Sequence, residues 1–247
     1  MTAAAPLLET RGFSLHAAGR CLLRALDWQV QAGERWCMIG RNAAGKSTLL
    51  RALAGLAVPQ RQGEVHWLGR PQRDWPAADA AWARSYAPQH LADRFPLSVQ
   101  RLLALSTVRP GPLTAEQALA QLDVLHLAQR GVMQLSGGER QRIALAQCAL
   151  QGAPLMLMDE PVSFQDPAHQ ARIAHWFARL VTPGSGAALV ASAHDVNWIQ
   201  RAATHVLALH GDGDWSAGRC EQLIAAPVLE RVYGCAWREA GGVWVAV

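Results

Sequence analysis

The pattern of apolar and polar residues predicts strands and turns over residues 7–40 and a helix after them. Residues 27–30 alternate between polar and apolar side chains, and residues 36–39 form a continuous apolar run that ends at Gly40. A short apolar run of this kind is typical of a buried strand. Residues 48–54 then have helical spacing, and Gly55 and Pro59 end the helix. The sequence therefore predicts a buried strand, a glycine-rich turn and a helix in succession.

Residues 90–154 have a different pattern, which predicts helices. Residues 97–105 have helical spacing, and the Pro-Gly-Pro stretch at 110–112 interrupts it. Thr114 and Gln117 form a capping box, which predicts a second helix through Leu127. Helices and strands then alternate to residue 210, as expected of a mostly parallel sheet. The predicted fold class is therefore α/β with a helical insertion.

Composition narrows the possible partners. The chain has 247 residues, 51% of them hydrophobic and 17% charged, and a formal net charge of +4. No Lys/Arg-rich run occurs, so dispersed basic charge is favoured over a nucleic-acid patch. The five cysteines form no C-x-x-C pair, which argues against a disulfide framework or a zinc site. We find no signal peptide and no apolar run long enough for a membrane span.

The glycine-rich turn carries the first candidate chemistry. Residues 40–47 read Gly-Arg-Asn-Ala-Ala-Gly-Lys-Ser, the G-x-x-x-x-G-K-[ST] pattern of a phosphate-binding P-loop. Of the 23 lysines and arginines only Lys46 is lysine, and its compact ammonium suits a tight loop better than a guanidinium fork. We expect Lys46 to contact the β- and γ-phosphates of ATP and Ser47 to bind Mg²⁺. The expected nucleotide-binding residues here are Gly40, Arg41, Asn42, Ala43, Ala44, Gly45, Lys46, Ser47 and Thr48.

A second motif follows the apolar residues 155–158, which predict a buried strand. Asp159 and Glu160 come directly after this strand, 113 residues beyond Lys46 (159 minus 46). A carboxylate suits Mg²⁺, either directly or through a bound water, so Asp159 is a candidate metal ligand. Glu160 is a candidate general base that orients and polarises the attacking water.

A third motif occupies residues 135–142, Leu-Ser-Gly-Gly-Glu-Arg-Gln-Arg. Ser136 is a natural N-cap, and Gly137 and Gly138 permit close approach of another group to the backbone. The positive end of the helix that follows favours an anion. By itself this pattern indicates only a good helix start, but beside the two other motifs it points to a nucleotide site.

Taken together, these motifs resemble those of the nucleotide-binding subunit of ATP-binding cassette (ABC) transporters over about residues 7 to 235. Residues 40–47 resemble Walker A, residues 156–160 Walker B, and residues 135–141 the ABC signature. Gln89 resembles the Q-loop glutamine, residues 163–166 occupy the D-loop place, and His194 resembles the switch histidine. The resemblance implies catalytic roles for Lys46, Gln89, Glu160 and His194, and Mg²⁺ ligation by Ser47, Gln89 and Asp159.

The chain departs from the family pattern at three places. Ala43 stands where the family often has glycine, and we expect it to be tolerated if its φ is negative. In the D-loop, Gln165 precedes Asp166 and Phe164 replaces a small residue, which affects the expected communication between subunits. The aromatic residue that usually stacks on adenine is not evident; by position it falls near His16 or Ala17, with Phe13 close by. His16 is the candidate for stacking, although an ordinary surface histidine is the favoured interpretation of it.

The resemblance also implies an architecture. It predicts a single ABC ATPase domain over residues 1–247, with a P-loop NTPase core at about 1–89 and 155–247 and a helical insertion at about 90–154. An N-terminal antiparallel β subdomain belongs to this fold. Two copies would enclose two ATP molecules, with Ser136, Gly137 and Gly138 of one copy completing the site of the other. Separate membrane permease subunits and a substrate-binding protein are the further expected partners, with the chain peripheral at the cytoplasmic face of the inner membrane.

The C-terminal residues suggest a cargo class. Residues 227–234 resemble the ending of importers for metal chelates, namely cobalamin, iron-siderophore and heme, with cobalamin slightly favoured. A surface for the permease is expected near Trp82, Leu91, Arg94, Phe95 and Pro96, although packing inside the insertion would explain them equally well. The alternatives are an ABC ATPase for another transported substrate, a soluble ABC protein acting on DNA or ribosomes, and a plain P-loop kinase. The kinase would not need residues 135–141 or His194.

Overall fold

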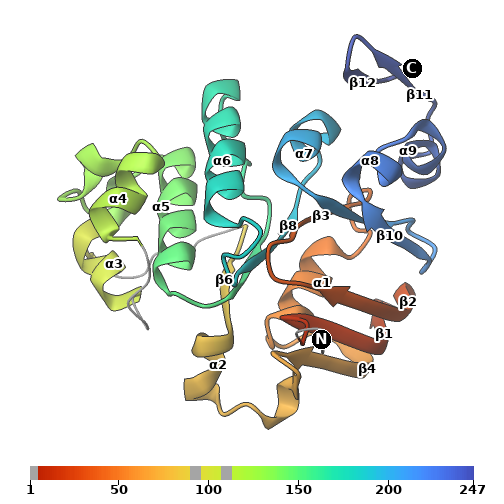
Figure 1. The fold of residues 1–247 in the computed structure, drawn as a ribbon, viewed down its shortest axis with the longest axis horizontal. Helices are drawn as coiled ribbons and strands as arrows, with labels where there is room; N and C mark the ends of the chain where they lie inside the picture. Colours follow the sequence, from red (N-terminus) through yellow and green to blue (C-terminus); the bar gives the residue numbers. More distant parts are fainter. Residues whose placement is uncertain (1–4, 90–95, 107–112) are drawn as a thin grey trace.

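A computed structural model of the chain describes residues 5–89, 96–106 and 113–247. Within these residues the fold contains a central sheet, an antiparallel sheet on one side of it and helices on the other (Figure 1). Leu91, Arg94 and Phe95, which were expected near the permease surface, lie outside the described residues. No described helix is long and apolar enough to cross a membrane.

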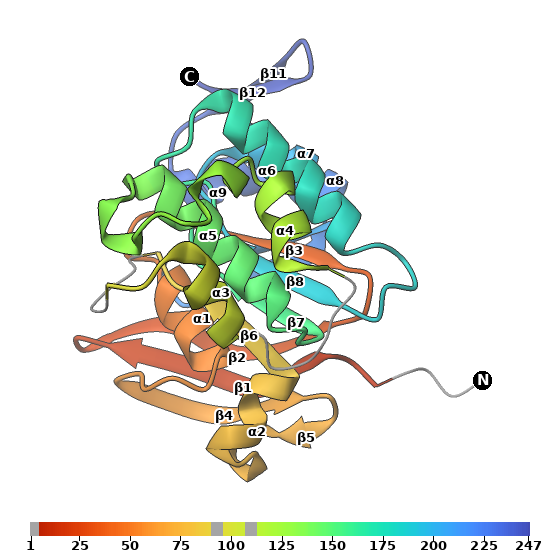
Figure 2. The same cartoon turned by 90° about the vertical axis from the view of Figure 1, so that its left-hand side faces the viewer.

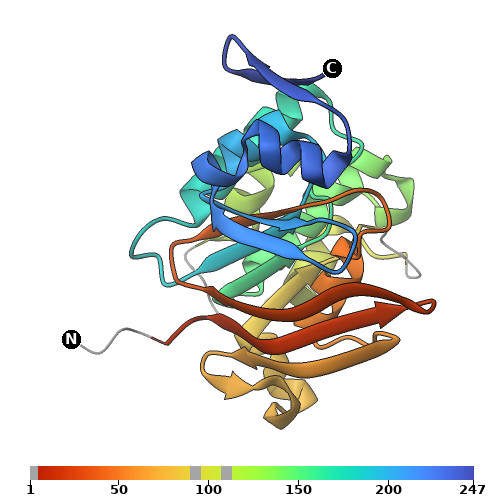
Figure 3. The same ribbon diagram turned by 90° about the vertical axis from the view of Figure 1, so that its right-hand side faces the viewer.

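The central sheet has six strands in the order β10-β9-β3-β8-β7-β6. All neighbours in it are parallel except β9 and β10, which confirms the mostly parallel sheet. Its strands are β3 (Arg35–Ile39), β6 (Arg84–Ala87), β7 (Leu155–Met158), β8 (Ala188–Ser192), β9 (His205–Leu209) and β10 (Trp215–Arg219). The antiparallel sheet contains β1 (Leu8–Ala17), β2 (Arg20–Val30), β4 (Gln60–Trp67) and β5 (Arg70–Pro71). In Figure 3 the red and orange strands of this second sheet lie below the blue strands of the central one.

The parallel strands are buried on both faces, which is why they are continuous apolar runs rather than alternating ones. In β3, Cys37 and Ile39 join one core cluster, whereas Trp36 and Met38 join the other. The first cluster lies under the helices α5 (Gly137–Leu150), α6 (Pro167–Leu180), α7 (Val196–Ala202) and α9 (Ala226–Tyr233). The second fills the space between the central sheet, α1 (Lys46–Leu53) and the antiparallel sheet.

Between β6 and β7 the described chain is helical, with α3 (Val99–Ser106), α4 (Ala115–Gln121) and α5 (Figure 2). Thr114 caps α4 with the predicted capping box to Gln117. The prediction that this helix continues through Leu127 is wrong. It ends at Gln121 because Asp123 adopts a left-handed conformation, with φ of 59°, and a 3₁₀ turn follows at Leu125–Leu127. The bend allows Leu119, Leu122 and Leu127 all to be buried in the first core cluster.

The remaining elements complete the connections and the C-terminus. They are α2 (Ala77–Ala83), α8 (Cys220–Leu223), the 3₁₀ turns Gln72–Asp74 and Val132–Gln134, and a C-terminal hairpin of β11 (Trp237–Ala240) and β12 (Val243–Ala246). The hairpin projects beyond α7 and α9 at one end of the molecule (Figures 1 and 3). Sequence reasoning predicted neither this hairpin nor the short helices.

Candidate functional site

The parallel strands bring the predicted motifs together, because their carboxyl ends lie at the same edge of the sheet. Gly40 follows β3, Asp159 follows β7, and His194 comes two residues after β8. Gln89 comes two residues after β6. Four motifs spread over residues 40–194 therefore meet at one edge.

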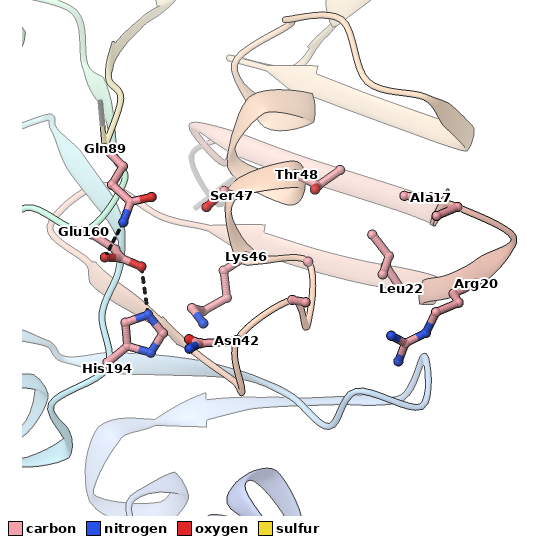
Figure 4. Close-up of a pocket in the computed structure, with 13 residues that line it drawn as sticks. Ala17, Arg20, Leu22, Asn42, Lys46, Ser47, Thr48, Gln89, Glu160 and His194 are labelled. Atoms are coloured by element: carbon pink, nitrogen blue, oxygen red, sulfur yellow. Dashed lines mark hydrogen bonds and ion pairs between the residues drawn. The ribbon is translucent and has the colours of Figure 1, made fainter. Parts of the chain in front are cut away.

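A cavity of about 930 Å³ opens at this edge (Figure 4). One wall carries Gln89, Glu160 and His194, and the P-loop with the first turn of α1 forms the floor. The opposite wall is formed by the end of β1, the turn after it and the start of β2, which contribute Ala17, Ala18, Arg20 and Leu22. The P-loop residues that line the cavity are Asn42, Ala43, Gly45, Lys46, Ser47 and Thr48. Gly40, Arg41 and Ala44 belong to the P-loop but do not line the cavity.

Lys46 is held at the centre of the P-loop. Its Nζ donates to the carbonyl oxygens of Gly40 at 2.7 Å and Arg41 at 3.1 Å, and only 6% of the residue is exposed. Burial lowers the pKa of Lys46 below its ordinary value, against the opposing charges of Glu160 and Asp159. A compact ammonium fits here because the loop wraps it closely, as the choice of lysine over arginine predicted.

The backbone of the P-loop is left-handed at two positions. Gly45 has φ of 100°, which favours glycine, and a Cβ there would lie 3.1 Å from the Cβ of Leu22. Ala43 has φ of 63°, so the condition on which its tolerance was expected to depend, a negative φ, is not met. The alanine is therefore tolerated with a steric cost of its Cβ, of about 1–2 kcal/mol for a left-handed L-residue.

Glu160 connects the side chains on the wall that it shares with Gln89 and His194. Its Oε1 lies 2.7 Å from Nε2 of His194, and its Oε2 accepts from Nε2 of Gln89 at 2.7 Å and from Oγ of Ser163 at 2.8 Å. Burial raises the pKa of Glu160, but the hydrogen bonds from Ser163 and His194 and the charge of Lys46 outweigh it, so the pKa lies below its ordinary value. The carboxylate is thus ionised near neutral pH, the form that can accept a proton, and it is positioned from three directions.

Asp159 is buried behind this wall, with 3% of the residue exposed. Its Oδ1 accepts from Oγ of Ser192 at 2.6 Å, and the same hydroxyl accepts from the backbone N–H of Glu160 at 2.9 Å. Ser192 therefore fixes both carboxylate residues at once. Sequence reasoning gave no role to Ser192 or Ser163, and only their places beside His194 and Glu160 could have suggested one.

The oxygen donors near the P-loop fit Mg²⁺. Ser47 supplies a hydroxyl and Gln89 an amide oxygen to the cavity, since the Gln89 amide nitrogen is engaged with Glu160. Asp159 does not line the cavity, but its carboxylate lies close enough for its charge to act on Lys46. Mg²⁺ prefers oxygen ligands and keeps waters or phosphate oxygens in its remaining positions, so few protein ligands are needed. Among the described residues, no cluster of three or more His, Cys, Asp or Glu could hold a metal ion. Bound there, the ion would neutralise phosphate charge.

The signature residues lie away from this cavity. Ser136 caps α5 with the capping box to Glu139, as predicted, but none of Ser136, Gly137 and Gly138 lines the cavity. They instead pack beside the D-loop. A Cβ on Gly138 would lie 2.9 Å from the carbonyl oxygen of Phe164, and Gln165 Nε2 donates to the carbonyl of Gly138 at 3.0 Å.

The side chains near the expected position of the adenine base are only partly those that the sequence indicated. His16 does not line the cavity, and the neighbouring Ala17 and Ala18 do. Arg20 and Leu22, which sequence reasoning missed, lie at the start of β2 and are the larger side chains on this wall (Figure 4). The described wall thus offers a planar guanidinium and an apolar side chain to a nucleotide base in place of an aromatic ring.

Comparison with known proteins places these motifs in one family. The family model described as "ABC transporter" matches residues 23–163. The hemin import ATP-binding protein HmuV of Streptomyces coelicolor is 35% identical over 92% of this chain and 83% of its own length. The protein of the same name from Pseudomonas aeruginosa is 33% identical over 92% of each chain.

Solved structures agree in fold. A nucleotide-free ATP-binding cassette from an ABC transporter superposes with a TM-score of 0.73 at 18% identity, covering 93% of this chain and 95% of that one. An ABC transporter described as metal-chelate type, in an inward-facing conformation, gives 0.75 at 23% identity, with 97% and 95% covered. At these identities the likeness concerns the fold alone, and it confirms the predicted fold class.

Proposed function

The chain belongs to the ABC transporter family of ATP-hydrolysing cassettes, and we propose that it is the ATPase subunit of an importer for hemin. The observation that carries the proposal is the 35% identity to a hemin import ATP-binding protein across 92% of the chain. Three further relatives named for hemin import are 30–34% identical over the same share. These names move the proposal from cobalamin, which the C-terminal residues slightly favoured, to heme within the same class of metal chelates.

The geometry of the cavity supports a separate role for each of its residues in ATP hydrolysis. Lys46 faces the place of the β- and γ-phosphates, and Ser47, Gln89 and Asp159 would hold Mg²⁺ there. Glu160 takes the proton of the attacking water, because it is ionised and held by three hydrogen-bond donors. His194, hydrogen-bonded to Glu160 and on the same wall, contacts the γ-phosphate and loses that contact when phosphate leaves.

A second copy of the chain completes this site in our proposal. Ser136, Gly137 and Gly138 lie outside the cavity of their own copy, although the N-terminus of α5 is an anion-binding end. ATP would then bind between Lys46 of one copy and Ser136 of the other, so that it favours the closed dimer.

Mixed dimers test this arrangement directly. Lys46→Ala and Ser136→Arg should each be inactive as pure protein, whereas an equimolar mixture should recover part of the ATPase activity. The reason is that a heterodimer contains one site with neither substitution. A mixture of Lys46→Ala and Glu160→Gln is the matched control. Both substitutions lie on the same side of the site, so each mixed site carries one of them and activity should stay absent. No recovery in the first mixture would contradict the shared site.

The permease is the expected membrane partner, and a hollow of about 470 Å³ beside α2 is a candidate contact for it. Leu68, Trp75, Asp79, Trp82 and Pro154 line this hollow. Trp82 is 41% exposed, so packing inside the insertion does not explain it. Apolar residues exposed together often mark an interaction surface. A permease contact there, with a substrate-binding protein on the opposite side of the membrane, would place the chain peripherally at the cytoplasmic face of the inner membrane.

Uptake of labelled hemin, cobalamin and a ferric siderophore by cells lacking this gene tests the cargo. Complementation with the wild type should restore hemin uptake, and Glu160→Gln, produced at an equal level, should not. Restoration of cobalamin or siderophore uptake alone would overturn hemin and keep the chelate class. No uptake defect for any of the three would leave another transported substrate, or a non-transport role for the ATPase.

A further inference from the structure

Arg41 connects the P-loop to the C-terminal end of the chain. Its Nε and Nη2 donate to the carbonyl oxygen of Tyr233 at 2.9 and 2.5 Å, across 192 residues of sequence. Tyr233 is the last residue of α9, where helix carbonyls lack intrahelical partners and carry partial negative charge. A charged fork on such a carbonyl is among the stronger hydrogen-bond arrangements.

Gly234 makes this approach possible. It adopts φ of 72°, and a Cβ on it would overlap the guanidinium of Arg41. Glycine is thus favoured by the left-handed conformation, and its missing side chain leaves the space that the guanidinium occupies. Arg41 also contacts the site through its backbone, because its carbonyl oxygen accepts from Nζ of Lys46 at 3.1 Å. One residue therefore joins α9 to the ammonium of the P-loop.

The C-terminal hairpin makes a second connection, to the helix that follows His194. Asn197 Oδ1 accepts from the backbone N–H of Trp244 at 2.7 Å, and its Nδ2 donates to the carbonyl of Trp244 at 3.0 Å. Asn197 is the second residue of α7, and its own N–H is capped by Asp195, the residue after His194. This paired contact fixes the start of α7 relative to the hairpin.

The C-terminal segment is itself anchored, so both connections end on a fixed support. Arg231 of α9 donates to Asp214 at 3.0 Å and lies 3.7 Å from Asp212, both in the loop between β9 and β10. Tyr233 and Trp237 pack with ring centroids 5.4 Å apart, which holds the hairpin against α9. The segment of α9 and the hairpin therefore links the P-loop at the floor of the cavity to the helix that follows His194.

We propose that α9 and the β11–β12 hairpin form a positioning element of the ATP site, with Arg41 and Asn197 as its two positioning residues. Arg41 holds the P-loop in its binding conformation, and Asn197 holds the turn that carries His194. The inference rests on the cavity being the ATP site and is independent of the imported cargo. Because one connection reaches the P-loop at the floor of the cavity and the other reaches the wall that carries His194, they should affect different steps.

The test compares ATP affinity and turnover in four variants of the full chain. Arg41→Ala should weaken ATP binding by about tenfold, as expected for loss of a charge-assisted hydrogen bond that organises the loop, with a smaller change in kcat. Arg41→Lys, which keeps the charge and loses the fork, should recover part of the affinity. Asn197→Ala should lower kcat and leave the KM for ATP nearly unchanged. Arg238→Ala, on the exposed part of β11, should match the wild type.

A purely structural role would lower the melting temperature and leave Kd, KM and kcat of the folded protein unchanged, and that result would overturn the proposal. If Arg41→Ala does not fold, Arg41→Lys and Asn197→Asp, which keeps the acceptor for Trp244, give the same comparison. Lys46→Ala distinguishes an error in the assignment of the ATP site from an error in the positioning element. If it binds ATP like the wild type, the assignment of the ATP site itself is wrong; if it loses binding while the Arg41 and Asn197 variants behave like the wild type, only the positioning element is wrong.

Discussion

The carboxylate of Glu160 lies 2.7 Å from the imidazole of His194, across the carboxyl edge of the central sheet. The two residues come from different strand ends, β7 and β8, and 16% of the Glu160 side chain is exposed against 41% for His194. Glu160 is therefore the shielded partner of the pair and His194 the more accessible one. This arrangement suits a base that is kept in place beside a residue that senses the bound phosphate.

Glu160→Gln should lower ATP turnover by about 10²–10⁴-fold, the usual contribution of a general base. The amide keeps the shape and most of the hydrogen bonds of the carboxylate, so ATP binding should remain largely intact. Phosphate release and the Kd for ATP, measured on the same preparation, check this. Glu116→Gln, at an exposed position in the first turn of α4, is the matched control. Hydrolysis at the wild-type rate in Glu160→Gln would exclude Glu160 as the base.

Arg20→Ala should weaken ATP binding by about two- to fivefold if the guanidinium stacks on the base, the size of an exposed cation–π contact. Titration with ATP and with tripolyphosphate separates base from phosphate contacts, since only the ATP affinity should fall. Arg24→Ala, on the same strand but 3.6 Å from Asp214, should leave both affinities unchanged. An equal loss for tripolyphosphate would show that Arg20 acts on the phosphates.

The sequence was sufficient for the P-loop, the carboxylates after β7 and the Ser136 cap, because each depends on neighbours in the chain. It did not yield Gln89 and His194 as partners of Glu160, since these two residues meet it only through the order of the strands. Ser163 is a local partner, three residues along the same loop, but the sequence alone gave no sign of its hydrogen bond. The contact between Arg41 and Tyr233 spans 192 residues and has no local signal. The C-terminal hairpin did have one, the pair Gly241-Gly242, which is typical of a two-residue turn.

Ala43→Gly should stabilise the protein by about 0.5–1 kcal/mol. Glycine removes the left-handed strain at φ of 63°, and part of that gain is offset by the greater freedom of glycine in the unfolded chain. Chemical denaturation measures the difference in the free energy of unfolding. Ala44→Gly is the opposite control, because Ala44 is buried and has no left-handed φ, so it should be destabilised. Destabilisation by Ala43→Gly would mean that the methyl group has a packing role.

Glu139 should make a small, pH-dependent contribution to stability. Hydrogen bonds from the backbone and side chain of Ser136 lower the pKa of Glu139 below its ordinary value. Since the folded pKa is below the unfolded one, the contribution is present above the unfolded pKa and lost as pH falls through the folded pKa. Glu139→Gln keeps the capping geometry and lacks the charge, so it should be slightly less stable at pH 7 and equal to the wild type in acid. A difference in unfolding free energy that persists unchanged into acid would contradict this.

Gln165→Leu, which restores the residue that the family usually has, should destabilise this protein by about 1–3 kcal/mol, the cost of leaving a buried polar partner unsatisfied. Gln165 Oε1 accepts from Nη1 of Arg142 at 2.7 Å, and its Nε2 donates to the carbonyl of Gly138. Only 8% of Arg142 is exposed, so water cannot replace the lost acceptor. Gln165→Glu keeps an acceptor for Arg142 and should lose less. Gln129→Leu removes an exposed glutamine pair with Gln100 and should cost little. Equal unfolding free energies for Gln165→Leu and Gln129→Leu would show that the D-loop glutamine does not support the signature helix.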